Sequence, residues 1–95
     1  MIYNNVLLRA RNTANIPQLK ELLTAQASTS LKEQGCMRFE VYHSESEPEV
    51  FLLVEWWQTQ RDLDAHRSSP NFVEVYRPQV LPLVERFPHP SERLI

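Results

Sequence analysis

The stretch Val50-Phe51-Leu52-Leu53-Val54-Glu55-Trp56-Trp57 decides the fold, because it is apolar on both faces of the β-strand that it predicts. Successive side chains of a strand point to opposite faces of the sheet. The two faces are Phe51, Leu53, Glu55 and Trp57 on one side and Val50, Leu52, Val54 and Trp56 on the other. An uncovered apolar face of this size is unusual in a monomer. We therefore expect a central strand, Glu49–Trp57, that is covered on both faces.

Three further strands are expected around this one. The segment Ile2–Ala10 is rich in β-formers and ends at a polar loop, and Cys36–His43 alternates apolar and polar residues before the turn Ser44–Pro48. A last strand, Leu83–Phe87, lies between prolines, which restrict it to a sheet edge or a short segment.

A long helix is expected between the first two strands. Apolar residues recur at three- and four-residue steps from Ile16 to Leu31, which places them on one side of a helix. Asn15 is expected to cap its N-terminus. Gly35 is expected to supply the left-handed residue at which the chain leaves the helix after Gln34.

The segment after the central strand predicts two shorter helices. Thr59 and Asp62 have the spacing of a capping box, which predicts a helix over Gln60–Arg67. The pair Ser69-Pro70 can begin a further helix that runs to about Arg77.

The resulting order βαββαβ predicts an α+β, ferredoxin-like fold, with two helices on one face of a four-stranded antiparallel sheet. Residues 1–95 are expected to form a single domain. The helices cover only one face of the sheet. A second copy of the sheet is the simplest cover for the other face, so we expect a homodimer with the sheets face to face.

Composition excludes several classes of site. A single glycine is too few for a phosphate-binding loop or a dinucleotide fingerprint, and a single cysteine excludes an internal disulfide. The three histidines are scattered, so no built-in metal site is expected. A net charge of −2 without a basic run argues against nucleic acid as a partner. We expect neither a signal peptide nor a membrane span, and therefore a cytoplasmic protein.

Four short motifs resemble the antibiotic biosynthesis monooxygenase domain family. They are Gly35-Cys36, Glu55-x-Trp57, Ala65-His66 and Ser69-Pro70-Asn71-Phe72. The resemblance extends from Val6 to Phe87 and implies a dimeric α/β barrel with a pocket between each sheet and its own helices. Members of this family include cofactor-independent oxygenases of quinols and anthrones, haem-degrading enzymes and isomerases of small sugars.

Two candidate catalytic residues follow. Glu55 is a carboxylate in an apolar strand, and burial raises the pKa of such a group, which makes it a candidate base. A structural hydrogen-bond acceptor is the alternative. His66, three residues after Leu63, is expected to face the sheet, where it can accept or carry a proton. A packing or capping role is the alternative for His66.

Four candidate substrate-binding residues complete the expected pocket. Trp57, Phe72 and Tyr76 can form aromatic walls for a planar ligand, although core packing explains these aromatics equally well. In oxygenases and haem-degrading members an asparagine of the first strand faces the pocket, and the resemblance assigns this place to Asn5. Haem-degrading members use an axial histidine where this chain has Val75-Tyr76-Arg77, so haem binding is disfavoured.

The function that the resemblance implies is that of a cofactor-independent monooxygenase. Its substrate would be a small planar phenol, quinol or anthrone-like molecule, with dioxygen as the second substrate. The alternative is a dimer that binds or isomerises a small ligand without oxygen chemistry. The sequence itself does not separate the two.

Overall fold

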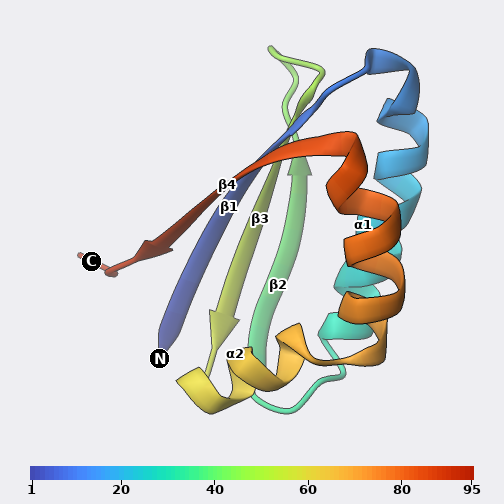
Figure 1. Cartoon of the computed structure of the whole chain (residues 1–95). Helices are drawn as coiled ribbons and strands as arrows, with labels where there is room; N and C mark the ends of the chain where they lie inside the picture. The colour runs from blue at the N-terminus through green and yellow to red at the C-terminus, as the bar shows by residue number, and fades with distance from the viewer.

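The computed structural model describes residues 1–95 as a curved sheet with all helices on one face (Figure 1). The strands are β1 (Ile2–Ala10), β2 (Cys36–His43), β3 (Val50–Trp57) and β4 (Val84–Ser91). The helices are α1 (Ile16–Ser30), α2 (Gln60–Arg67) and the π-helix η2 (Phe72–Val80). Two 3₁₀ turns, η1 (Thr13–Asn15) and η3 (Leu81–Leu83), connect them to the strands.

The sheet is antiparallel throughout, with strand order β2-β3-β1-β4. The two central strands pair so that Asn4 lies opposite Glu55 and Leu8 opposite Phe51. This order confirms the predicted ferredoxin-like α+β fold.

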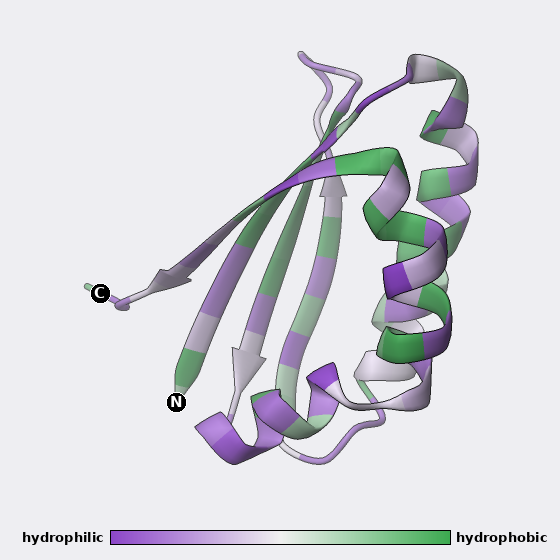
Figure 2. Cartoon of the chain, viewed as in Figure 1, coloured by the Kyte–Doolittle hydropathy of each residue, from purple (hydrophilic) through white to green (hydrophobic).

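The two faces of the sheet have different surroundings. The side chains that β1 and β3 turn toward the helices form the core. Both central strands are largely apolar in their middle parts (Figure 2). The main cluster consists of Val6, Leu8, Ala10, Leu19, Leu23, Phe51, Leu53, Tyr76, Val80 and Val84. On the outer face no helix covers the sheet, and Leu52 and Phe87 are exposed. Val50 alone among the predicted outer residues of β3 is buried.

The boundaries of α1 differ from the prediction. The helix ends at Ser30 rather than Gln34, and Leu31 is exposed rather than part of the apolar stripe. Asn15 makes no side-chain cap, because the preceding 3₁₀ turn takes the chain into the helix and Asn12 caps that turn through the backbone N–H of Ala14.

Gly35 has the left-handed conformation that was expected, with a φ of 78°. Because Gly35 has no side chain, α2 can also pack closely against the backbone at this position. A β-carbon at this position would lie 2.6 Å from the β-carbon of Asp62 and 2.0 Å from one of its carboxylate oxygens. The backbone N–H of Asp62 donates to Thr59 Oγ1, as the capping box predicted. The Asp62 carboxylate accepts from the Thr59 hydroxyl at 3.0 Å, instead of from the Thr59 backbone N–H. Glycine therefore sets the position of α2.

The last third of the chain also departs from the prediction. The helix expected to end near Arg77 is a π-helix that continues to Val80 and contains Pro78. Pro78 has no backbone N–H and so cannot donate the hydrogen bond of a regular α-helix. The wider π-helical turn ends instead with a hydrogen bond from the Leu81 N–H to the Tyr76 carbonyl oxygen. The edge strand β4 continues past the predicted end at Phe87 to Ser91. Prolines are tolerated there because an edge strand forms hydrogen bonds with a neighbour on only one side.

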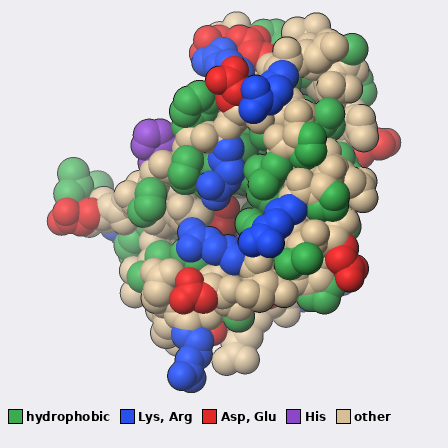
Figure 3. All heavy atoms as spheres, in the orientation of Figure 1, with side chains coloured by type: hydrophobic (Ala, Val, Ile, Leu, Met, Phe, Trp, Pro, Cys, Tyr) green, Lys and Arg blue, Asp and Glu red, His purple; other side chains and the backbone are tan.

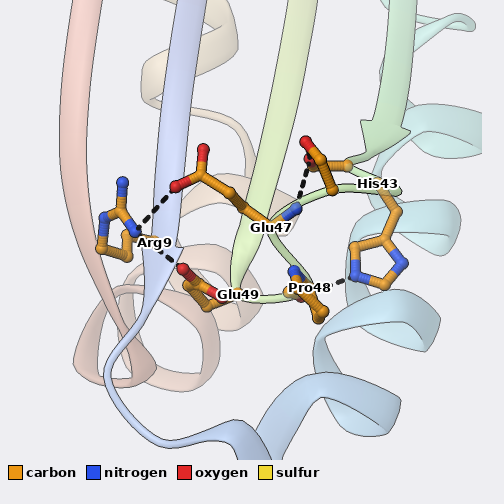
Figure 4. Close-up of polar contacts among 7 residues, drawn as sticks. Arg9, His43, Glu47, Pro48 and Glu49 are labelled. Carbon is orange, nitrogen blue, oxygen red and sulfur yellow. Dashed lines mark hydrogen bonds and ion pairs between the residues drawn. The ribbon is translucent and has the colours of Figure 1, made fainter.

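Polar contacts fix the turn between β2 and β3 at the end of the sheet away from Glu55 (Figure 4). Arg9 donates to Glu49 at 2.9 Å, and the Arg9–Glu47 ion pair spans 3.9 Å. His43 Nε2 lies 2.7 Å from Pro48 O, and its ring stacks on Phe51 with centroids 4.5 Å apart. These contacts give His43 a structural role in this turn.

Candidate functional site

A small cavity lies between the sheet and the helices α1, α2 and η2. Its walls are Asn4, Gln26, Leu53, Glu55, Leu63, His66, Arg67, Phe72, Tyr76 and Arg86. The volume of about 10 Å³ is room for one water-sized group. Six of the ten side chains are polar or charged and one is a tyrosine, which is an unusual lining for a space inside a protein core.

Glu55 reaches this cavity from β3 and is only 4% exposed. Its Oε1 accepts a hydrogen bond from Trp57 Nε1 at 3.0 Å. Burial raises the pKa of the Glu55 carboxyl, while the Trp57 hydrogen bond, the nearby His66, the Asn4 amide and Arg86 oppose this rise. Glu55 can therefore act as a proton acceptor inside the protein, and it is also the structural acceptor for the Trp57 indole.

His66 reaches the same cavity from α2 and is also 4% exposed. Its ring lies between aromatic side chains, with centroids 4.6 Å from Trp57 and 5.3 Å from Phe72. Its hydrogen-bond partner is Glu33, whose Oε1 lies 2.5 Å from Nδ1. The two candidate catalytic residues thus share a cavity without a direct hydrogen bond between them.

Phe72 and Tyr76 line the cavity, but Trp57 does not, so the expected placement of Trp57 on the cavity wall is wrong. Trp57 packs with Phe39 and Leu63 and reaches the site only through its contacts with Glu55 and His66. Trp57 is fully buried, and the rings of Phe72 and Tyr76 are 4.9 Å apart. The Tyr76 hydroxyl accepts a hydrogen bond from Arg86 Nε at 3.2 Å. Burial raises the pKa of this phenol, and Arg86 opposes the effect. The cavity therefore has an aromatic wall beside a polar pair, the Tyr76 hydroxyl and the Arg86 guanidinium.

The placement expected for Asn5 is wrong. Its side chain lies on the outer face of the sheet and donates to Ser91 Oγ at 3.0 Å. Asn4 lines the cavity instead and is 3% exposed. A strand alternates faces at every residue, so an offset of one position reverses the side. Asn4 shares its face with Val6 and Leu8, and this alternation was the signal that could have identified it.

Sequence reasoning also missed Gln26, Glu33, Arg67 and Arg86. The Asn4 Oδ1 and Gln26 Oε1 atoms are buried without a hydrogen-bond partner. Buried acceptors of this kind normally have a donor. The cavity therefore offers unused acceptors to a hydroxyl group or water, beside the cationic side chains Arg67 and Arg86. Basic side chains also gather near the middle of the face in Figure 3.

The rest of the chain offers neither a metal site nor a reactive thiol. No three His, Cys, Asp or Glu side chains come close enough together to hold a metal ion. Burial, with Glu33 and Glu55 nearby, raises the pKa of the Cys36 thiol to about 11, which makes it a poor nucleophile. No helix has both the length and the apolar character that crossing a membrane requires.

Comparison with known proteins identifies the family. A sequence model described as "Antibiotic biosynthesis monooxygenase" matches residues 1–77. The chain belongs to this family. The match includes the cavity residues from Asn4 to Tyr76, whereas β4, with Arg86, lies beyond its end.

One curated relative is a Mycobacterium tuberculosis protein named "Putative monooxygenase Rv0793". It is 35% identical over 68 residues, which are 72% of this chain and 65% of that protein. The aligned part is thus slightly less than two thirds of the relative's length.

Solved structures share the fold over nearly the whole chain. A Bacteroides thetaiotaomicron protein described as a "Possible Oxidoreductase" of unknown function has a TM-score of 0.89 and 29% identity, and 97% of this chain and 96% of that chain are covered. A "Putative antibiotic biosynthesis monooxygenase" from Nitrosomonas europaea has a TM-score of 0.86 and 24% identity, with 98% and 90% covered. The second likeness concerns the fold alone.

Proposed function

We propose that this protein is a monooxygenase that needs no cofactor and acts on a small planar phenol, quinol or anthrone-like substrate. Family membership and the name of the mycobacterial relative support the reaction class. The observation that carries the proposal is the meeting of a buried carboxyl group, Glu55, and a buried imidazole, His66, at one cavity with an aromatic wall.

The chemistry begins with removal of a proton from the substrate. Glu55 or His66 takes this proton, and the electron-rich anion that remains passes one electron to dioxygen. In the anthrone case, a CH₂ group becomes a carbonyl with one oxygen atom, and the two hydrogens leave with the other oxygen atom as water. The substrate supplies all the electrons, so the balanced reaction requires no external reductant.

The residues of the cavity have distinct parts in this scheme. Trp57 holds the Glu55 carboxylate through its indole N–H. The unpaired acceptor of Asn4 can receive a substrate hydroxyl, and Arg86 can balance the negative charge of the anion. Phe72 and Tyr76 present aromatic surface to a planar ring. Because the cavity holds only one water-sized group, a substrate must displace part of the wall that Phe72 and Arg67 form.

We also propose that the protein is a homodimer with the outer sheet faces together. Leu7, Leu52 and Val54 line an apolar hollow of about 330 Å³ on this face. Leu52 is 41% exposed in the single chain, and burial of such surface against a second sheet would remove it from water. The dimer leaves the cavity free, because the cavity lies on the helical side of the sheet.

Oxygen consumption with a panel of quinols and anthrones tests this function. The wild type is expected to consume oxygen with at least one substrate, and Glu55→Gln and His66→Ala are each expected to slow the reaction about 100-fold or more. Glu21→Gln, at an exposed position of α1 away from the cavity and the outer face, is the matched control and should retain wild-type rates. If every substrate leaves oxygen unconsumed while a ligand raises the melting temperature, the protein is a binding or isomerising dimer instead.

A further inference from the structure

His66 connects the cavity with a separate groove on the surface of the helical layer. This groove has a volume of about 210 Å³, and its walls are Glu33, Gln34, Asp62, Ala65, His66 and Ser69. His66 is the one residue that lines both the groove and the cavity. Its partner Glu33 comes from the turn between α1 and β2 and belongs to the groove alone. The His66 side chain therefore borders both spaces.

The hydrogen bond to Glu33 determines which nitrogen of His66 carries the proton. A carboxylate can only accept hydrogen bonds, so the Nδ1 atom 2.5 Å from Glu33 Oε1 must be the donor. In a neutral imidazole the other nitrogen, Nε2, is then an acceptor. Nε2 lies on the opposite side of the ring from Nδ1 and thus faces away from Glu33. The neighbouring rings of Trp57 and Phe72 restrict rotation of the imidazole.

We propose that Glu33 is a positioning residue, which fixes His66 in the Nδ1–H tautomer so that Nε2 accepts the hydroxyl group of the bound substrate. This proposal rests on the proposed function of the cavity. In the proton-transfer step the substrate O–H bond breaks, an Nε2–H bond forms and the electron pair stays on the oxygen. The Glu33 carboxylate then balances the charge of the imidazolium.

Glu55 complements this arrangement rather than competing with it. The Glu55 carboxylate already accepts the Trp57 indole, and burial raises its pKa. The Glu33 side chain is 20% exposed, so water can stabilise its charge. The two carboxyl groups therefore differ in their access to water. Glu55 belongs to the wall of the cavity, whereas Glu33 acts from outside it and only through His66.

A purely structural ion pair between the α1–β2 turn and α2 is the alternative role for Glu33. Both roles predict the same contact in the resting protein. They differ in what happens when a hydroxyl group enters the cavity, because only a positioning role requires Nε2 to receive it. They differ also in kinetics, because loss of a structural tie lowers the melting temperature without a specific effect on kcat.

Nitrogen-15 NMR of histidine side chains tests the proposal with phenol as the probe. At pH 8 the wild type is expected to show a protonated Nδ1 and an unprotonated Nε2 for His66, and phenol should shift the Nε2 signal. Glu33→Gln should reduce the Nδ1–H population and weaken the shift at least twofold, while Glu33→Asp restores both. Glu21→Gln, an exposed position of α1, is the matched control. A protonated Nε2 in the wild type, or a phenol titration that leaves Nε2 unchanged, overturns the proposal.

Kinetics separate this proposal from the function on which it rests. If oxygen uptake is found, Glu33→Gln should lower kcat about tenfold or more with KM changed less than twofold. An unchanged kcat with a lowered melting temperature makes Glu33 a structural tie and contradicts the proposal. If no substrate supports oxygen uptake but phenol shifts Nε2 as expected, the oxygenase function fails and the positioning role of Glu33 stands.

Discussion

The two faces of β3 carry similar apolar side chains, but the helices of the chain cover only the inner face. On the inner face, Leu53 and Trp57 pack beneath the helices around a carboxyl group, Glu55. On the outer face, Leu52 and Val54 line an open apolar hollow. The comparison teaches that a sheet can be apolar on both sides when its own helices cover only one. The inner face then provides a cavity, and the outer face leaves apolar side chains exposed that the proposed dimer would cover.

Replacement of one leucine on each face should give the largest effects. Leu53→Asp should prevent folding, because an unpaired charge in the core costs several kcal/mol. Leu52→Asp should leave the fold intact and dissociate the dimer, because the side chain is exposed in the single chain. Circular dichroism and light scattering measure the two outcomes. The comparison fails if Leu52→Asp remains a dimer, or if the wild type scatters as a single chain at micromolar concentration.

Gly35→Ala should destabilise the inner layer by about 2 kcal/mol or more, from the left-handed backbone and the contact with Asp62. Urea unfolding measures the loss. Asp62→Ala removes the two nearest atoms that a new β-carbon would meet, Oδ2 and Cγ, and leaves only the β-carbon at 2.6 Å. The double variant should therefore lose less than the sum of the two single changes. Additive losses would mean that the contact between Gly35 and Asp62 does not determine the position of α2.

Glutamates on the two faces should respond to pH in opposite directions. Burial raises the pKa of Glu55 above its usual 4.5, so its contribution to stability is present in acid and is lost as the pH rises above 4.5 through the raised pKa. Glu55→Gln should abolish this loss and unfold at higher urea concentration than the wild type at pH 7. Each unit of pKa elevation corresponds to about 1.4 kcal/mol.

Glu40 provides the outer-face control for this experiment. Hydrogen bonds from Arg38 and Tyr42 lower the pKa of Glu40, so its contribution is present above pH 4.5 and is lost as the pH falls toward the lowered pKa. Glu40→Gln should therefore be less stable than the wild type at pH 7, with a small difference at this exposed site. Equal pH profiles for the two variants would contradict the assignment of Glu55 to a desolvated face.

Tyrosines on the two faces should show the smallest contrast. Tyr76→Phe removes the hydroxyl that accepts from Arg86 and should cost about 1 kcal/mol of stability. Tyr42→Phe removes a hydroxyl that donates to Glu40 on the exposed surface, and its effect should stay within about 0.5 kcal/mol. Thermal unfolding at pH 7 compares the two. A larger loss for Tyr42→Phe would reverse the expected ranking of the faces.

The sequence predicts the fold and much of the cavity because side-chain alternation in a strand is strict. Glu55 and Trp57 share a face for this reason, and the capping box at Thr59 correctly starts α2. The same rule could have separated Asn4 from Asn5. Gln26 was detectable in principle, because it is buried on the same side of α1 as Leu19 and Leu23.

Other features depend on contacts between distant segments and have no local pattern. Glu33 meets His66 across 33 positions of the chain, from a turn without periodicity. The π-helix forms around Pro78, which from sequence alone indicates only the end of a helix. The extension of β4 through Pro88 and Pro90 depends on pairing with β1, which local propensity opposes.

The two adjacent tryptophans give the most direct test of the central claim, because they lie on opposite faces of β3. Trp57 donates its indole N–H to Glu55 at the cavity, and Trp56 contacts Tyr3 and Arg38 on the outer face. The indole N–H signals can be assigned with Trp56→Phe and followed by NMR. Addition of 2-naphthol should shift the Trp57 signal and leave Trp56 in place, whereas Leu52→Asp should shift Trp56 and leave Trp57 in place. A ligand that shifts Trp56 alone would put the binding site on the outer face and contradict the account.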